Sequence, residues 1–157
     1  MARTTPATLA LDKAEVAYEL HTYAYDPSAD KVGLQAAAGL GVDPGMVLKT
    51  LMALVDGKPV CAVLPSDREV AMKKLAAAIG GKSAQMMKPA EAERLTGYHV
   101  GGISPFGQKR AVPVVLEESA LALPKVFLNG GQRGLQVALD PAAARDALGA
   151  VVAGIVA

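Results

Sequence analysis

The stretch LKTLMALVDGKPVCAVLP, residues 48–65, predicts a β-hairpin near the middle of the chain. Two apolar runs of strand length flank the dipeptide Asp56-Gly57, which is typical of the two-residue turns that join antiparallel strands. An antiparallel pair at this place excludes a sheet made of parallel strands alone. We therefore expect a mixed sheet rather than a doubly wound parallel fold.

Helices and strands are interspersed on both sides of this hairpin. Thr5-Pro6, Asp43-Pro44 and Asp140-Pro141 each combine a helix cap with proline at the first helical position. Further helices are expected over 32–41, over 68–81 with Asp67 as the cap, and from Pro89 to about Leu95. Strands are expected within 16–25, 83–86, 112–116, 125–129 and 135–139. With no internal repeat or linker, the sequence predicts one mixed α/β (α+β) domain over residues 1–157.

The composition is that of a globular chain. It has 157 residues, of which 52% are hydrophobic and only 4% aromatic, so the core must consist of Ala, Val, Leu, Ile and Met. A single cysteine, Cys61, excludes an internal disulfide framework and a paired-cysteine zinc site. The sequence has no signal peptide and no apolar run long enough to cross a membrane, which predicts a cytoplasmic protein.

Positive charge is concentrated in the middle of the chain. The net charge is only +1, but residues 49–136 hold 12 Lys and Arg against 7 Asp and Glu, a net charge of +5. The rest of the chain therefore carries a net charge of −4. Such asymmetry is typical of a face that binds a polyanion, although a solvated surface gives the same pattern.

Covalent and metal-dependent catalysis find little support in the sequence. Ser104 follows Gly102 as in a nucleophile elbow, but Pro105 and Phe106 break that motif, and only two histidines, His21 and His99, are available. Two His and one Cys match no ligand spacing. Cys61 lies in an apolar run and is expected to be a small buried hydrophobe. The glycine patterns GLGVDPG and NGGQRG do not match a dinucleotide fingerprint.

An anion-binding pocket is the chemistry that the remaining motifs favour. The segments GGISPFGQKR, residues 101–110, and NGGQRG, residues 129–134, are glycine-rich loops next to predicted strands. Such backbone can direct several N–H groups at one anion or carbonyl, and Lys49 can add a point charge. Taken singly, each loop is more simply explained as a tight turn and Lys49 as a surface lysine, and only their combination favours a pocket.

Four linked motifs resemble the YbaK/EbsC family of free-standing aminoacyl-tRNA deacylases, relatives of the editing domain of bacterial prolyl-tRNA synthetase. They are Lys49-Thr50, TGY at 96–98, GGISP at 101–105 and GGxRG at 130–134. The resemblance implies a barrel-like, mixed and largely antiparallel sheet surrounded by helices. It also implies trans-editing, the hydrolysis of the ester that joins a wrong amino acid to tRNA, most directly Cys-tRNA(Pro). A second hydrolytic check is reasonable because one pocket separates near-isosteres by only ~1–3 kcal/mol.

The resemblance also implies roles for individual residues. Lys49 would contact the terminal phosphate or ribose and the carbonyl. The loop that faces the aminoacyl group would stabilise the oxyanion with its backbone, and it comprises Gly101, Gly102, Ile103, Ser104 and Pro105. Asn129, Gly130 and Gly131 match a neighbouring loop, and Tyr23 matches a tyrosine of the pocket wall. The implied partners are the 3′ aminoacyl end of tRNA and prolyl-tRNA synthetase, with no DNA, membrane or cofactor. Either water or the substrate's own thiol would attack.

Two positions depart from the family's pattern. Val32 stands where an aromatic residue is common, and Gln136 stands where many members carry an acid that could hold the substrate ammonium. Both changes leave the choice of amino acid open, so a deacylase for Ala- or Ser-charged tRNA is an alternative. A non-catalytic module that binds tRNA ends or a synthetase is a second alternative.

Overall fold

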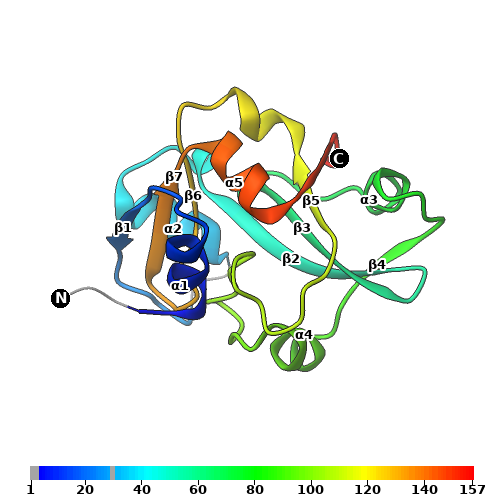
Figure 1. The fold of residues 1–157 in the computed structure, drawn as a ribbon, viewed down its shortest axis with the longest axis horizontal. Helices are drawn as coiled ribbons and strands as arrows, with labels where there is room; N and C mark the ends of the chain where they lie inside the picture. Colours follow the sequence, from blue (N-terminus) through cyan, green and yellow to red (C-terminus); the bar gives the residue numbers. More distant parts are fainter. Residues whose placement is uncertain (1–3, 29–30) are drawn as a thin grey trace.

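The computed structural model describes residues 4–28 and 31–157, whose strands form two sheets (Figure 1). One sheet has the order β1-β7-β6, with β1 at Glu19–Thr22, β6 at Val126–Asn129 and β7 at Leu135–Leu139. The other has the order β4-β2-β3-β5-β8 and contains β2 (Leu48–Val55), β3 (Lys58–Pro65), β4 (Ala84–Met86), β5 (Val114–Glu117) and β8 (Val151–Ala153).

The predicted hairpin is confirmed as the centre of the larger sheet. Strands β2 and β3 pair antiparallel from Leu48↔Pro65 to Val55↔Lys58, and Asp56 and Gly57 form the turn with positive φ angles of 49° and 81°. Two positive φ angles match the right-handed twist of the flanking strands. The carboxylate of Asp56 also accepts hydrogen bonds from the N–H groups of Lys82 and Ser83, which anchor the start of β4.

The mixed sheet is confirmed, but the expected barrel is not observed. Strand β3 pairs with β5 in parallel, and β5 pairs with β8 in parallel, while the other strand pairs are antiparallel. In the described part of the chain, β1 and β4 each pair on one side only, so the strands do not close into a ring. The sheets meet instead at a bridge between Val47 and Phe127, where β2 and β6 begin and run alongside each other.

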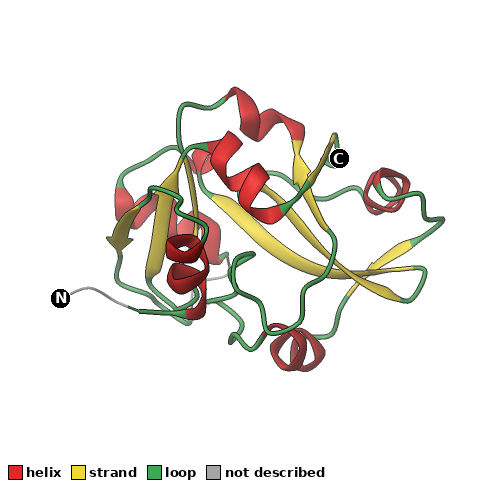
Figure 2. Ribbon diagram, viewed as in Figure 1, coloured by secondary structure: helices red, strands yellow, loops and turns green. Residues whose placement is uncertain are grey.

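Within the described residues, five α-helices and two 3₁₀ turns cover these sheets (Figure 2). They are α1 (Pro6–Lys13), α2 (Val32–Leu40), η1 (Pro44–Met46), α3 (Met72–Ala78), α4 (Pro89–Thr96), η2 (Glu118–Ala122) and α5 (Pro141–Leu148). The three predicted cap-and-proline starts are confirmed, since the side chains of Thr5, Asp43 and Asp140 each accept a backbone N–H. None of these described helices has the length and hydropathy needed to cross a membrane.

Asp67 is not the cap of α3, so that prediction is wrong. The helix begins at Met72 and not at Arg68. The backbone before it is extended and pairs with the end of the chain. Val70 forms a bridge with Val156, and the N–H of Ala71 donates to the carbonyl of Ile155 at 2.7 Å. Residues 151–156 carry no strand pattern, so neither β8 nor this pairing was predicted.

Glu117 fastens this C-terminal segment to the larger sheet. Its side chain is 2% exposed and accepts hydrogen bonds from the N–H groups of Ser119 at 2.8 Å and Ile155 at 2.9 Å. Burial raises the pKa of Glu117, but these hydrogen bonds together outweigh burial and leave the pKa below its usual value. The carboxylate is therefore a structural anion.

We expect Glu117→Ala to lower the free energy of unfolding by about 3 kcal/mol at neutral pH, because the N–H groups of Ser119 and the buried Ile155 lose a charged acceptor. The folded-state pKa is depressed, so this stabilisation is present above the unfolded-state pKa and is lost as the pH falls through the folded-state pKa. Urea unfolding at neutral and acid pH tests this. The exposed neighbour Glu118→Ala is the control, and an equal loss in both variants would contradict the assignment.

Candidate functional site

A cavity of about 400 Å³ opens where β2, the start of α2, α4, the loop after α4, the end of β6 and the start of β7 come together. Its lining residues include side chains from both sheets, so it lies at the junction that the Val47–Phe127 bridge creates. The lining is largely apolar with a few polar groups, as is typical of small-ligand sites.

Six of the residues proposed from the sequence line this cavity, and six do not. Those in the lining are Val32, Lys49, Gly101, Ile103, Asn129 and Gln136. Those outside it are Tyr23, Gly102, Ser104, Pro105, Gly130 and Gly131. Lys49, the loop at residues 101–110 and Asn129, at the start of the second glycine-rich segment, therefore reach one cavity, although Lys49 and Asn129 are 80 positions apart in the sequence.

Lys49 lies on β2 opposite Leu64 and is only partly exposed. Burial lowers the pKa of its ammonium group, and the charge of Lys31 lowers it further, while Glu69 and Asp67 act in the opposite sense. In the described residues, no ion pair or hydrogen bond occupies the Lys49 ammonium. A partly desolvated cation without a partner is well suited to an anionic ligand.

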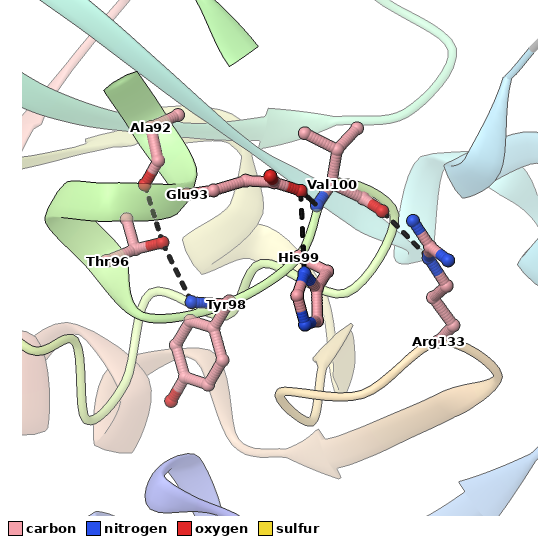
Figure 3. Close-up of polar contacts among 7 residues, drawn as sticks. All are labelled: Ala92, Glu93, Thr96, Tyr98, His99, Val100 and Arg133. Atoms are coloured by element: carbon pink, nitrogen blue, oxygen red, sulfur yellow. Dashed lines mark hydrogen bonds and ion pairs between the residues drawn. The ribbon is translucent and has the colours of Figure 1, made fainter. Parts of the chain in front are cut away.

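The loop after α4 is held by polar contacts on both sides (Figure 3). The carboxylate of Glu93 accepts the N–H of Val100 at 2.8 Å and lies 3.7 Å from Nδ1 of His99. From the other side, Nε of Arg133 donates to the carbonyl of Val100 at 2.9 Å. The guanidinium of Arg133 in turn lies over the ring of Tyr25, 5.6 Å from its centre. The loop is thus fixed before any ligand binds.

Asn129 links the two glycine-rich loops through its side-chain amide. Its Nδ2 donates to the carbonyl of Gly101 at 3.2 Å, and its Oδ1 accepts the N–H groups of Gly131 at 2.7 Å and Gln132 at 3.2 Å. One buried side chain therefore sets the distance between the loops. Asn129 also pairs across the sheet with Gln136, which places both at the cavity.

The loop amides differ in what they can offer a ligand. The N–H of Gly102 donates to the carbonyl of His99 at 2.8 Å, so it is already used. For Gly101 and Ile103, no acceptor for the N–H is found among residues 4–28 and 31–157. Gly101 has a φ of 92°, a conformation that side chains rarely adopt. These two amides are the candidate donors to a ligand oxygen.

The other proposed residues serve the packing around the site. Ser104 is fully buried, and its Oγ accepts the N–H of Phe106 at 3.1 Å. Gly130 donates its N–H to the carbonyl of Leu135, and its own carbonyl accepts the hydroxyl of Thr5. Pro105 is buried in the same turn as Ser104. These groups position the loops but do not reach the cavity.

Tyr23 does not line the cavity; it packs against α2. The two are so close at Gly39 that a Cβ placed on this glycine would lie 2.8 Å from the Cβ of Tyr23. Its hydroxyl is buried and has no hydrogen-bond partner in the described part of the chain. Desolvation raises the pKa of this hydroxyl, so the phenol stays neutral.

Sequence reasoning missed several lining residues. Thr50 is one of them, and its Oγ1, like Oε1 of Gln136, is buried with no partner in the residues that the structure describes. Met86 and Val100 are exposed at the cavity and form an apolar rim, and Lys31 and Glu69 add a salt bridge of 3.4 Å. Of these residues, only Thr50 had a signal in the sequence, because Lys49-Thr50 is one of the four motifs that carry the resemblance.

The candidate nucleophiles and metal ligands lie elsewhere. Burial raises the pKa of the Cys61 thiol to about 12, so it remains protonated inside the sheet. His21 packs edge-on against Phe127, and neither it nor His99 lines the cavity. The described residues contain no cluster of three or more His, Cys, Asp or Glu side chains placed to hold a metal.

Comparison with known proteins assigns this arrangement to a class. Residues 26–147 match the family described as the aminoacyl-tRNA editing domain. The chain belongs to this family, which confirms the resemblance and the deacylase class predicted from the sequence.

Particular relatives make the match more specific. The chain is 35% identical over 141 residues to EbsC of Enterococcus faecalis, named as a candidate Cys-tRNA(Pro)/Cys-tRNA(Cys) deacylase, and the match covers 88% of this chain and 85% of that protein. It is also 39% identical over 95 residues to the proline–tRNA ligase of Maridesulfovibrio salexigens, of which it spans 16%.

Solved structures support the fold. One, described as a candidate trans-editing enzyme for prolyl-tRNA synthetase, superposes with a TM-score of 0.81 at 22% identity and 99% coverage of both chains. Another, described as a hypothetical protein, has a TM-score of 0.84 at 25% identity, with 98% of this chain and 100% of that chain covered.

Proposed function

We propose that the protein hydrolyses the ester bond between a wrong amino acid and the 3′-terminal ribose of tRNA, with Cys-tRNA(Pro) as the leading substrate. The observation that carries this proposal is the convergence of Lys49, Gly101 and Ile103 on one cavity of about 400 Å³. The reaction adds water across the ester and releases the free amino acid and a tRNA with a free ribose hydroxyl.

In this mechanism the protein binds and polarises but supplies no nucleophile. The Lys49 ammonium holds the terminal phosphate or ribose beside the carbonyl. As the ester carbon becomes tetrahedral, the amides of Gly101 and Ile103 donate to the developing oxyanion, and one such donor can contribute ~10²–10³ in rate. An aminoacyl ester is already activated, so positioning and oxyanion stabilisation suffice for either water or the substrate thiol to attack.

Cysteine is favoured as the amino acid because EbsC, which this chain resembles over most of its length, is named for cysteine-charged tRNA. In the lining, the carboxylate of Glu69 is already paired with Lys31. Among the described residues, Oε1 of Gln136 and Oγ1 of Thr50 are the unpartnered lining atoms that could face the amino acid's ammonium. Both are neutral, so they bind an ammonium group less strongly than a carboxylate would. Alanine and serine esters therefore belong in the test.

We further propose that residues 1–157 act as one deacylase domain and that prolyl-tRNA synthetase contributes to selectivity as a partner. So small a chain can contact little of the tRNA body. Because charged tRNA is consumed in translation, the expected location is the cytoplasm.

A deacylation panel tests the proposal: Cys, Ala, Ser and Pro on tRNA(Pro), and Cys on tRNA(Cys), each with and without prolyl-tRNA synthetase. We expect turnover of at least one mischarged species above the uncatalysed rate, with Cys-tRNA(Pro) fastest. Rates equal to background across the whole panel would instead support a non-catalytic module that binds tRNA ends.

The protonation state of Lys49 should limit activity at alkaline pH. Because burial lowers the pKa of its ammonium, this group loses its charge at a lower pH than an exposed lysine does. We expect kcat/KM, corrected for spontaneous ester hydrolysis, to decline on the alkaline side at a lower pH than an exposed lysine would cause. Lys49→Arg should remove this decline, since a guanidinium stays charged throughout. The same decline in both proteins would rule out Lys49 as its source.

A further inference from the structure

Helix α4 borders a second cavity, of about 440 Å³, which shares no lining residue with the first. Pro89 and Ala92 of α4 face the first cavity, whereas Glu91, Arg94 and Leu95 line the second. Lys109 and Arg110 complete the second lining, and they are the cations at the end of the GGISPFGQKR segment. We call these five residues the basic groove. Figure 1 shows α4 at the lower edge of the molecule.

The basic groove has an excess of unpaired positive charge. Arg94, Lys109 and Arg110 are exposed, and Glu91 is the one acidic residue in the lining. In the part of the chain that the structure describes, no salt bridge engages any of the three cations. Three like charges held close together repel one another, so an anionic ligand relieves a cost already present in the free protein.

The main chain, and not the side chains, fixes this cluster. The N–H of Lys109 donates to the carbonyl of Thr96 at 2.8 Å, and the N–H of Arg110 donates to the carbonyl of Leu95 at 3.2 Å. Both bonds satisfy carbonyls of the last turn of α4, which otherwise lack partners. The side chains of Lys109 and Arg110 are thus free for a ligand while their positions stay fixed.

From this arrangement we propose that the basic groove binds the sugar–phosphate backbone of the RNA strand behind the aminoacyl end. Guanidinium groups contact phosphate oxygens in a bidentate manner, and lysine adds a point charge. Residues of α4 line both cavities. When the aminoacyl group occupies the first cavity, the nucleotides on the 5′ side of the terminal adenosine therefore reach the surface beside α4. This inference rests on the proposed function, because it takes charged tRNA as the ligand.

The test compares two substrates of different length: Cys-tRNA(Pro), and a short ester of cysteine with adenosine, which carries no phosphate. In the triple variant Arg94→Gln, Lys109→Gln, Arg110→Gln, we expect KM for Cys-tRNA(Pro) to rise about 10- to 100-fold. The slope of log(kcat/KM) against log[salt] is negative, and we expect it to become less steep by about 2 to 3, roughly one for each lost phosphate contact. Kinetics on the short ester should remain as in the unmodified protein.

A matched control removes the same charge elsewhere. Lys13, Lys58 and Lys73 lie on α1, β3 and α3, they are exposed, and they line neither cavity. Their triple change to Gln should leave KM and the salt slope unaltered. If this control changed KM and the salt slope as much as the groove variant does, the effect would come from net charge alone, and the proposal would be overturned. Thermal melting shows whether each variant is folded. If the triple groove variant is unfolded, the single variant Lys109→Gln replaces it in the test, and we expect a smaller rise in KM.

The outcomes separate this proposal from the proposed function. If the unmodified protein hydrolyses neither substrate, the function fails. If it hydrolyses both and the groove variant keeps its KM and salt slope on tRNA, the groove proposal alone fails. Loss on the short ester as well would also overturn the groove as a separate RNA site. Unchanged tRNA kinetics with a lost response to prolyl-tRNA synthetase would assign the groove to a protein partner instead.

Discussion

Replacing Lys49 with alanine should lower kcat/KM for Cys-tRNA(Pro) by about 10²–10³, the effect of removing one charged group from a preorganised oxyanion site. Lys49 is the lining cation that has no ion-pair partner among the described residues, and burial strengthens its field by excluding water. If the ammonium acts on the carbonyl, kcat falls; if it only holds the phosphate, the loss appears in KM.

Single-turnover deacylation under saturating enzyme separates these two effects. The control is Lys58→Ala, which removes an exposed lysine from the partner strand of the same hairpin. We expect it to be within about twofold of the unmodified protein, as is usual for surface changes. Near-normal activity in Lys49→Ala would remove the central element of the mechanism.

Gly102→Ala should separate the two loops and lower kcat/KM by about 10- to 100-fold, because a misplacement of about 1 Å at a site can cost this much. A Cβ at Gly102 would lie 2.9 Å from the backbone N of Arg133 and 3.0 Å from the carbonyl carbon of Gln132. Backbone cannot yield as a flexible side chain can, so the loops must move. Overpacking of this kind also destabilises by about 1–3 kcal/mol.

The matched control is Gly45→Ala, since its nearest contact is the side-chain oxygen Oδ1 of Asp43 at 3.3 Å. Neither Gly102 nor Gly45 has a positive φ, so the two substitutions differ in contact and not in backbone strain. Melting temperature and deacylation rate are measured for both variants. Full activity in a folded Gly102→Ala protein would mean that the spacing of the loops does not matter for the reaction.

Local signals predicted most of the fold. Asp56-Gly57 and Asp140-Pro141 encode a turn and a cap within a few residues, so they could be located from the sequence. The cap predicted at Asp67 was wrong because the cap pattern is local. The helix start is decided instead by pairing of residues 70 and 71 with residues near 155. The short strand β8 has three residues and no alternation of burial, which left no pattern to detect.

The site was only partly predictable for a similar reason. The glycine loops and Lys49 carry family motifs, but the bonds that bring them together join residues 28 and 33 positions apart, as in Asn129–Gly101 and Arg133–Val100. No periodicity encodes such contacts. Met86 contributes to the rim through its place on an edge strand, and Arg94 borders the basic groove through the turn of α4. Both depend on tertiary geometry.

The amide bridge at Asn129 has a chemical consequence for the ageing of the protein. Asn129 precedes Gly130, and Asn-Gly is a sequence prone to deamidation, because the glycine nitrogen can attack the side-chain carbonyl. Here that nitrogen donates to Leu135 and both ends of the asparagine amide are engaged, so the folded state opposes ring closure. Conversion to aspartate would place a carboxylate against the Gly101 carbonyl. The cavity therefore keeps its geometry only as long as the chain stays folded.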